Sequence, residues 1–316
     1  MNFQTRIPIF QQSSCPIDYD SKIFLLGSCF SENIGNKLSY CKFQSAQNPF
    51  GILFHPKAIE TLIYRAINEK QFTENEVFFF NERWHCFDVH SHLSSISKES
   101  ILDTINAELT ATLKHLKKSS HLVITLGTSW VYRLKESNAI VANCHKIPQH
   151  QFVKELLTVN QISTSLKSMV SLIKKINPSI NFIFTISPVR HLKDGFIENQ
   201  LSKSNLISAV HDVKGKEEKI FYFPSYEIMM DELRDYRFYK EDMIHPNSIA
   251  IDYIWEKFSE GWISNEAMVV LQQIMKIQKS LEHKPFNPAS KEHLKFLESV
   301  QKQIKKVQEK YPRISF

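Results

Sequence analysis

The chain of 316 residues is 42% hydrophobic and 23% charged, which suits one large globular domain with an appendage and excludes a disordered protein. Its net charge of +6 is uneven, because residues 264–316 contain ten Lys or Arg and five Glu, a net charge of +5. The nearly neutral remainder excludes a typical nucleic-acid-binding surface. The basic tail is either a solvated helical face or a site for an acidic partner.

The five cysteines are an odd number without a C-x-x-C pair, which argues against a disulfide framework and against a structural zinc site. Residues 1–10 lack the basic and apolar regions of a signal peptide. No run approaches the roughly 20 apolar residues that span a bilayer. We therefore expect a cytoplasmic protein without a membrane span.

Short apolar runs and helical patterns alternate through most of the chain. The runs at 23–26, 40–45, 121–126, 181–187 and 219–223 predict strands, and apolar residues at helical spacing predict helices at 31–38, 57–69, 100–118, 159–176, 199–213 and 248–262. This order predicts an α/β domain over residues 1–262, with a parallel sheet and helices on both of its faces.

Two segments depart from this alternation. Apolar runs on either side of Asn81-Glu82 predict a β-hairpin inserted at residues 76–87. Residues 263–316 contain two amphipathic helical patterns separated by Pro285 and Pro288, which predicts a basic helical hairpin packed on the main domain.

Gly27, Ser28 and Cys29 lie where the first apolar strand meets a helical pattern. Such strand–turn–helix junctions present nucleophiles or cradle phosphates. The glycine spacing of a phosphate loop is missing, so the junction predicts a nucleophile turn that offers a hydroxyl and a thiol. Further polar clusters follow Leu126 and Ile186, at strand carboxyl ends where α/β proteins bind their ligands.

Asp242 and His245 form a D-x-x-H-P segment with Pro246. The proline favours a loop conformation for His245 just before a helix. A carboxylate three residues earlier can accept from one ring nitrogen, so that the other nitrogen faces a nucleophile as general base. The alternatives are a surface ion pair and a lone loop histidine.

These segments together resemble a known family. Leu26–Ser31 resembles the first block of the SGNH (GDSL-type) hydrolases, L-G-D-S-L-S, and the D-x-x-H-P segment resembles the last block of that superfamily. Gly27-Ser-Cys-Phe-Ser31 is more similar still to the GSCFA family, which is placed in the SGNH superfamily. Four other segments are similar to that family: Asn48-Pro-Phe-Gly51, residues 141–146, residues 187–191 and Arg234-Asp-Tyr-Arg-Phe-Tyr239.

The resemblance covers about residues 22–262 and implies a flavodoxin-like SGNH fold. It aligns the nucleophile serine of the superfamily with Cys29 and the preceding aspartate with Ser28, so Cys29 is the first candidate nucleophile and Ser28 the second. A helix N-terminus and an imidazole would lower the pKa of Cys29 toward neutrality. The alternative is a buried structural cysteine beside a turn.

The oxyanion hole that the resemblance implies is altered in this chain. The resemblance implies an oxyanion hole made of the nucleophile's own N–H, a glycine N–H and an asparagine side chain. Gly51 would supply the glycine N–H, with Asn48 and Gly127 as further oxyanion or substrate-binding candidates. The G-x-N-D block aligns with Gly127–Trp130, so that Ser129 takes the asparagine position. Asn143 is either a substitute donor or an asparagine that caps a turn.

Two polar clusters, at residues 145–146 and 190–194, bind an anionic or sugar substrate if they meet at one edge of the sheet, and otherwise are solvated loop groups. They comprise His145, Lys146, Arg190, His191, Lys193 and Asp194. The spacing of His145, His191, Asp194 and His245 matches no tight metal-ligand motif, so we predict no metal and no cofactor.

We therefore expect an acyl-ester hydrolase or acyltransferase with a relay of Cys29 (or Ser28), His245 and Asp242, acting on a small-molecule or glycan acyl substrate such as an acylated sugar or an envelope component. The competing hypothesis is an SGNH-fold module that binds a glycan or protein partner without catalysis. A metallohydrolase is a third. The sequence leaves the acyl group, the acceptor and the oligomeric state open.

Overall fold

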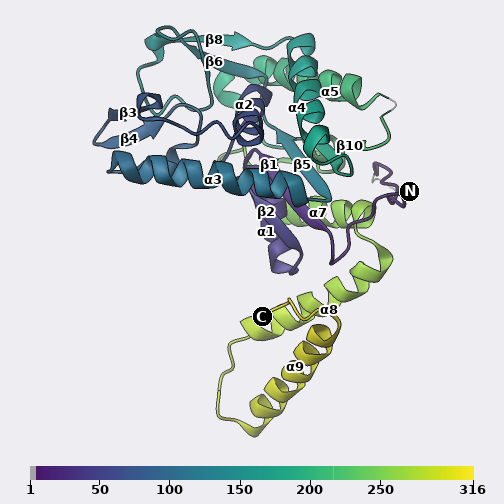
Figure 1. Cartoon of the computed structure of the whole chain (residues 1–316). Helices are drawn as coiled ribbons and strands as arrows, with labels where there is room; N and C mark the ends of the chain where they lie inside the picture. Colours follow the sequence, from purple (N-terminus) through teal and green to yellow (C-terminus); the bar gives the residue numbers. More distant parts are fainter. Residues whose placement is uncertain (1–4, 216) are drawn as a thin grey trace.

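The computed structural model describes residues 5–215 and 217–316 (Figure 1). Residues 1–4 lie outside the described residues. They belong to the predicted domain at residues 1–262 and to residues 1–10, for which no signal peptide is expected. The central sheet has five parallel strands in the order β10-β9-β5-β1-β2. They are β1 (Lys22–Gly27), β2 (Gln44–Gln47), β5 (His121–Leu126), β9 (Asn181–Ile186) and β10 (Ile220–Phe223).

Counted along the chain, these five strands have the spatial order 2-1-3-4-5 of a flavodoxin-like sheet. The order reverses between β1 and β5, which are hydrogen-bonded neighbours. Ligands of such folds bind beyond the carboxyl ends of the strands at this reversal, which here is the edge where Gly27 and Leu126 lie. The predicted α/β fold with a parallel sheet between helices is confirmed.

Helices connect the strands and extend the chain at its carboxyl end. The helices are α1 (Cys29–Tyr40), α2 (Pro56–Ile67), α3 (Lys98–Lys118), α4 (Val159–Ile176), α5 (Phe196–Lys214), α6 (Ser225–Glu227), α7 (Ser248–Trp262), α8 (Asn265–Glu282) and α9 (Lys291–Lys310). Short 3₁₀ turns lie at Glu74–Glu76, Ser91–Leu93, Gln149–Gln151, Leu192–Asp194 and Tyr236–Phe238, and a π-helical turn lies at Ile228–Glu232.

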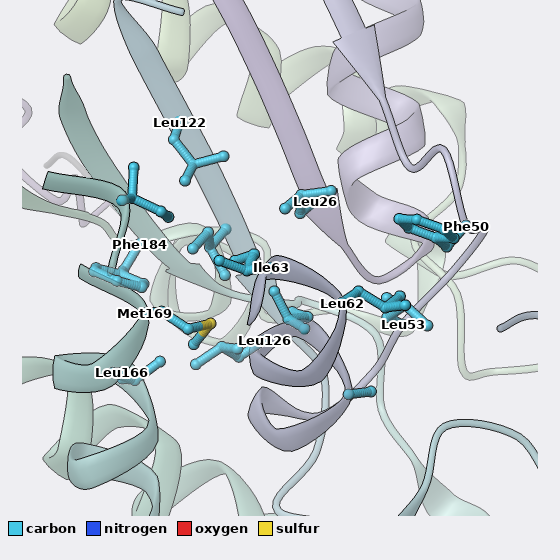
Figure 2. Close-up of a cluster of buried hydrophobic side chains, with 14 of the residues drawn as sticks. Leu26, Phe50, Leu53, Leu62, Ile63, Leu122, Leu126, Leu166, Met169 and Phe184 are labelled. Atoms are coloured by element: carbon cyan, nitrogen blue, oxygen red, sulfur yellow. The ribbon is translucent and has the colours of Figure 1, made fainter. Parts of the chain in front are cut away.

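Alternate residues of β1, β5, β9 and β10 enter two apolar cores, because successive strand side chains point to opposite faces. Phe24 and Leu26 of β1 pack in a core with α2, α3, α4 and α5, whereas Ile23 and Leu25 pack on the other face with α1, α7 and α8. Figure 2 shows part of the first core, in which Leu26 lies with side chains of α2 and α4. The strand ends that border the candidate site are therefore fixed from both faces.

The segment predicted as an inserted hairpin contains the antiparallel strands β3 (Val77–Phe80) and β4 (Arg83–Cys86). Its two turn residues, Asn81 and Glu82, both have positive φ, as a type I′ turn requires. The strand predicted at 40–45 begins only at Gln44, because α1 continues to Tyr40. A second antiparallel sheet, in the order β7-β6-β8, was not predicted. Its strands are β6 (Trp130–Leu134), β7 (Ile140–Val141) and β8 (Phe152–Leu156).

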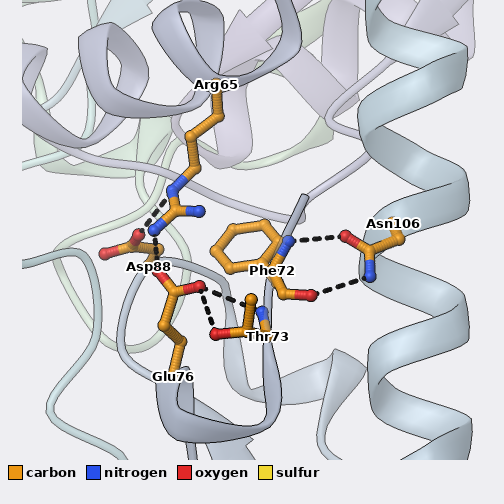
Figure 3. A network of polar contacts seen from close by, with 6 residues as sticks. All are labelled: Arg65, Phe72, Thr73, Glu76, Asp88 and Asn106. Atoms are coloured by element: carbon orange, nitrogen blue, oxygen red, sulfur yellow. Dashed lines mark hydrogen bonds and ion pairs between the residues drawn. The ribbon is translucent and has the colours of Figure 1, made fainter. Parts of the chain in front are cut away.

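A buried arginine joins α2 to the hairpin (Figure 3). The Arg65 guanidinium forms ion pairs with Glu76 and, at 3.3 Å, with Asp88, and it stacks 4.1 Å from the centroid of the Phe72 ring. The backbone of Phe72 in turn exchanges two hydrogen bonds with the Asn106 side chain of α3. Burial raises the pKa of Asp88, and the Arg65 charge opposes this shift.

The predicted C-terminal helical hairpin is confirmed, and α8 and α9 extend below the sheet in Figure 1. It contacts the domain through a 3.0 Å hydrogen bond from Gln278 Nε2 to the Tyr40 carbonyl oxygen and through the Tyr311 ring, 5.1 Å from that of Tyr19. Tyr40 ends the helix that Cys29 begins, so about 17 Å of helix separates this contact from the nucleophile turn. Within residues 5–215 and 217–316, no helix combines the length and apolar character needed to cross a bilayer.

Candidate active site

The nucleophile turn connects β1 to α1 at the reversal point of the sheet. Gly27 has a φ of 132°, and a side chain there would collide with the Thr125 carbonyl oxygen of the neighbouring strand. Ser28 is fully buried and caps α1, because its Oγ accepts from the Phe30 N–H at 3.3 Å. Cys29, the first residue of α1, is partly exposed. Of the two candidate nucleophiles, the thiol is therefore the more accessible group.

The pKa of Cys29 differs in direction from the sequence-based expectation. Burial and the Glu32 carboxylate raise it, and together they outweigh the ammonium groups of Lys203 and Lys240, which lower it. The helix N-terminus is present as expected, but the low-dielectric surroundings of the thiol favour its neutral form more strongly. Cys29 is thus mainly a thiol at neutral pH and needs a base to become a nucleophile.

Asp242 holds His245 through three hydrogen bonds. Its Oδ1 accepts from the backbone N–H groups of Ile244 at 2.8 Å and His245 at 2.9 Å, and its Oδ2 lies 2.7 Å from His245 Nδ1. The pKa of Asp242 is lowered to about 2 by the hydrogen bonds that it accepts from the backbone N–H groups of His245 and Ile244 and from the imidazole. The carboxylate therefore fixes the proton on Nδ1 and leaves Nε2 as a proton acceptor.

The loop that carries His245 lies against the loop that follows β9. Arg190 N–H donates to the Ile244 carbonyl oxygen at 3.2 Å, and the Arg190 guanidinium donates to that of Met243. Lys240, whose charge acts on Cys29, donates its N–H to the His245 carbonyl oxygen at 2.7 Å. Within residues 5–215 and 217–316 no hydrogen bond joins Cys29 Sγ to the His245 ring, although catalytic hydrogen bonds are often long before substrate binds.

Three of the expected oxyanion donors are already engaged. The N–H of Gly51 donates to the Asn48 carbonyl oxygen at 2.8 Å, and that of Gly127 donates to the Phe54 carbonyl oxygen at 2.7 Å. The buried Ser129 hydroxyl donates to the Ser202 carbonyl oxygen at 3.1 Å.

Asn48 retains a free donor. Its Oδ1 accepts from the Gly27 N–H at 2.9 Å, and its buried Nδ2 has no partner among the described residues. This amide thus both fixes the end of β1 and offers a hydrogen bond beside the nucleophile turn.

The first polar cluster contacts the inserted hairpin. Asn143 Oδ1 accepts from the His145 N–H at 2.8 Å, and His145 Nε2 lies 2.7 Å from the Cys86 carbonyl oxygen in the hairpin. Lys146 is exposed. These residues order the loop against β4, and none of their side-chain hydrogen bonds within the described chain leads to Cys29 or His245.

The second cluster divides between the site and the surface. His191 and Arg190 lie beside the His245 loop, whereas Lys193 is exposed and Asp194 pairs with Lys154 of β8 at 2.5 Å. Of the four residues considered for a metal, the side chains of His145, Asp194 and His245 have separate partners, and no three His, Cys, Asp or Glu side chains converge within the described ranges.

Comparison with family models assigns most of the chain. The model described as GSCFA family matches residues 22–258, and the model described as GSCFA domain protein, C-terminal domain, matches residues 274–316. The chain belongs to the GSCFA family. The first match ends within α7, and the second begins inside α8 and contains α9, so a separate C-terminal model covers most of the helical hairpin.

Other comparisons add little to the GSCFA assignment. A search of curated proteins gives no match. The crystal structure of a carbohydrate esterase family 3 protein from Talaromyces cellulolyticus is 9% identical, with coverage of 81% of this chain and 99% of that chain and a TM-score of 0.38. At that identity and TM-score, the likeness supports no conclusion about activity.

Lys203 is a site residue of this GSCFA domain that the sequence analysis missed. It is fully buried on α5, and its Nζ donates to the carbonyl oxygens of Gly127 at 2.7 Å and Ser187 at 2.8 Å. Burial lowers its pKa to about 7, and the Cys29 thiolate opposes this shift. A lysine on the same helical stripe as the apolar Leu206 and Val210 was the signal that could have identified it.

A small cavity of about 200 Å³ opens beside the His245 loop of the GSCFA domain. Its walls include Arg190, Tyr236 and Tyr239, and the guanidinium lies 4.3 Å from the centroid of the Tyr239 ring. Arg190 Nε is buried and has no partner among the described residues. The cavity therefore combines an aromatic wall with a cation and an unused hydrogen-bond donor.

Proposed function

We propose that this chain is an acyl-ester hydrolase or acyltransferase in which Cys29 is the nucleophile, His245 the general base and Asp242 the group that orients the imidazole. The main support is the set of three hydrogen bonds from Asp242 to the His245 segment, which leaves Nε2 free as a proton acceptor. The second support is the position of Cys29 at the start of a helix, at the reversal point of the sheet.

Because Cys29 is mainly protonated, the first step couples proton transfer to attack. His245 Nε2 takes the thiol proton while sulfur bonds to the ester carbonyl carbon, and the carbonyl π pair moves to oxygen. The carbonyl then re-forms, the C–O bond to the leaving alcohol breaks, and the proton on Nε2 passes to the departing oxygen. The product is a thioester on Cys29.

The second half of the reaction releases the acyl group. Water, or a hydroxyl of an acceptor, gives its proton to His245 Nε2 and attacks the thioester carbon, and the thiolate of Cys29 leaves and regains that proton. Hydrolysis and acyl transfer differ only in the molecule that attacks.

The cavity beside Arg190 suggests the class of substrate. Its tyrosine wall suits the apolar face of a sugar ring, and the guanidinium with its unpaired Nε suits a hydroxyl, a carboxylate or a phosphate. We therefore propose an acylated sugar or an acylated envelope component as the substrate.

Turnover of p-nitrophenyl acetate and of an O-acetylated monosaccharide, with and without an added sugar acceptor, tests this function. Cys29→Ala is expected to abolish turnover, and Cys29→Ser is expected to retain a measurable fraction because it keeps a nucleophile in place. Ser28→Ala removes only a helix cap and is expected to lower stability by about 1 kcal/mol while turnover remains. Unchanged turnover in Cys29→Ala would refute the assignment, and loss only in Ser28→Ala would make Ser28 the nucleophile.

A binding module without catalysis is the second candidate, and the raised pKa of Cys29 together with the engaged Ser129 hydroxyl favours it. This hypothesis predicts that an acetylated glycan binds equally to the unmodified chain and to Cys29→Ala, and that neither releases acetate. Calorimetric binding combined with an acetate assay separates the two functions, since release of acetate by the unmodified chain alone would exclude the binding module.

A further inference from the structure

The proposed reaction generates an oxyanion, and the expected donors at this edge of the sheet are largely occupied. As described above, the N–H groups of Gly51 and Gly127 and the hydroxyl of Ser129 all donate to protein carbonyl oxygens. A site that lacks one such donor loses roughly 10²–10³ in kcat. Asn48 Nδ2 is the unpartnered donor already described beside the turn, and a second donor from another part of the chain would stabilise the oxyanion further.

His191 offers an unused ring nitrogen at this position. Its backbone N–H is fixed by Asn199 Oδ1 at 2.8 Å, and its ring packs edge-on against the Phe54 ring with centroids 5.6 Å apart. Its Nε2 is buried and has no partner among the described residues. Because buried polar atoms in folded proteins are nearly always hydrogen-bonded, an unpartnered one next to a candidate site suggests a ligand.

The strand register brings the segment that this nitrogen borders to the same edge of the sheet as the nucleophile turn. Gly27 of β1 pairs with Thr125 of β5. Cys29 and Gly127 each follow two residues later, so both lie just past the carboxyl ends of these neighbouring strands. Neighbouring strands are about 4.8 Å apart. His191 Nε2 lies only 3.1 Å from the point where a Cβ of Gly127 would be, so the glycine leaves room for the ring at this strand end.

The surroundings of His191 keep its ring neutral. Burial, the Lys203 ammonium on α5 and the His245 ring on the facing loop lower the pKa of His191 to about 3. A neutral imidazole with its proton on Nε2 is a hydrogen-bond donor that does not compete with His245 as a base. Lys203 also fixes the Gly127 and Ser187 carbonyl oxygens, which holds together the two loops that border the ring.

We propose that His191 is a catalytic residue whose Nε2–H donates a hydrogen bond to the oxyanion formed when Cys29 attacks the ester carbonyl. This inference rests on the proposed function. When the C–S bond forms, the carbonyl π pair moves to the oxygen facing Nε2, and the hydrogen bond shortens as negative charge develops there. The proton stays on His191 throughout, while the thiol proton moves to His245.

Steady-state kinetics of the full chain with p-nitrophenyl acetate test the proposal, using His191→Phe, His191→Gln and the control His121→Phe. His121 is a buried histidine at the amino end of β5, remote from the turn, so its replacement reproduces the same change of side chain outside the site. We expect His191→Phe to lower kcat roughly 100-fold or more with little change in KM. His191→Gln retains an N–H donor of similar reach, so its kcat is expected to be at least tenfold higher than that of His191→Phe. The kcat of the control His121→Phe is expected to stay within twofold of that of the unmodified chain.

The outcomes separate this inference from the function on which it rests. Turnover that depends on Cys29 but is unchanged in His191→Phe would overturn the role of His191 and leave the proposed function intact. An equal loss in the Phe and Gln variants would likewise overturn a donor role, because it would reveal a structural effect of the ring. An unmodified chain without Cys29-dependent turnover would overturn both proposals. Thermal unfolding of each variant identifies any loss caused by misfolding, and a destabilised His191→Phe is then compared at a temperature where it is folded.

Discussion

Lys203 Nζ lies 2.7 Å from the carbonyl oxygen of Gly127, the residue that directly follows β5. The same ammonium bonds to the Ser187 carbonyl oxygen beyond β9. A single buried charge thereby ties two adjacent strand ends to α5. Its ionisation is consequently linked to the stability of the fold as well as to the charge around Cys29.

Replacing Lys203 by Met is expected to change how stability depends on pH. The pKa of Lys203 is lowered from 10.5 to about 7, so above pH 7 the unfolded chain binds a proton that the folded chain releases. The free energy of unfolding of the unmodified chain, relative to Lys203→Met, therefore rises as pH increases from 7 toward 10.5. Between pH 7 and 9 the rise is expected to be on the order of 2 kcal/mol. Urea unfolding of both proteins at pH 7, 8 and 9 measures it, and a constant difference would mean that Lys203 stays charged throughout.

Replacing Asp242 by Asn is expected to reduce kcat roughly 10³-fold, because the amide no longer holds the proton on His245 Nδ1. The pKa of Asp242, lowered to about 2, keeps the carboxylate ionised from about pH 3 upward, so Asp242 does not cause a fall of rate between pH 4 and 6. A pH–rate profile of the unmodified chain and of Asp242→Asn checks both statements. Full activity in the variant would contradict the orienting role of the carboxylate.

Alkylation of Cys29 is expected to be slow at pH 7 and to accelerate above pH 9, because burial and Glu32 raise the pKa of the thiol. Iodoacetamide labelling, followed peptide by peptide with mass spectrometry, distinguishes Cys29 from the other partly exposed cysteines, Cys15 and Cys144. Glu32→Gln removes the carboxylate and is expected to shift the Cys29 profile to lower pH while the Cys15 profile stays unchanged. Rapid labelling of Cys29 at pH 6–7 would show instead that it forms a thiolate–imidazolium pair.

Replacing Arg65 by Met is expected to lower the free energy of unfolding by about 3 kcal/mol at pH 7, because Asp88 and Glu76 lose their buried partner. Burial already raises the pKa of Asp88, and removal of the opposing Arg65 charge raises it further. A folded state with a raised carboxyl pKa loses stability as pH rises. Arg65→Met is therefore expected to lower the free energy of unfolding more at pH 7 than at pH 4. Urea unfolding at both pH values measures the difference, with Arg65→Lys as the control that keeps the charge. An equal cost at both pH values would contradict the electrostatic origin.

Local patterns were sufficient to predict β1, β5, β9 and β10 of the main sheet, whereas β2 was placed too early in the chain. Helix α4 was predicted with its observed bounds, because its apolar residues repeat at helical spacing and Asn177-Pro178 follows its end. The structure adds a capping box of Thr158 and Gln161 at its start. Strand β8 was missed because it pairs only with β6 at the edge of a small sheet and has exposed residues in its middle, which gives no apolar run. Helix α1 begins two residues earlier than predicted because Ser28 caps it.

The candidate site was predictable only where its chemistry is local. The spacing of Asp242 and His245 predicted the contact between their side chains, which the structure shows at 2.7 Å. The pKa of Cys29 and the position of Lys203 depend on burial among distant segments, which the neighbouring sequence does not reveal.

The most direct test of the account is the intact mass of the protein during turnover of p-nitrophenyl acetate, quenched in acid within the first turnovers. The account predicts one added acetyl group, which peptide mapping places on Cys29, and its absence in Cys29→Ala under the same conditions. The fraction of chains that carry the acetyl group is expected to be larger in Asp242→Asn if this substitution slows release of the acyl group more than its attachment. Substrate turnover with no acyl group on Cys29, or with an acyl group that persists in Cys29→Ala, would contradict it.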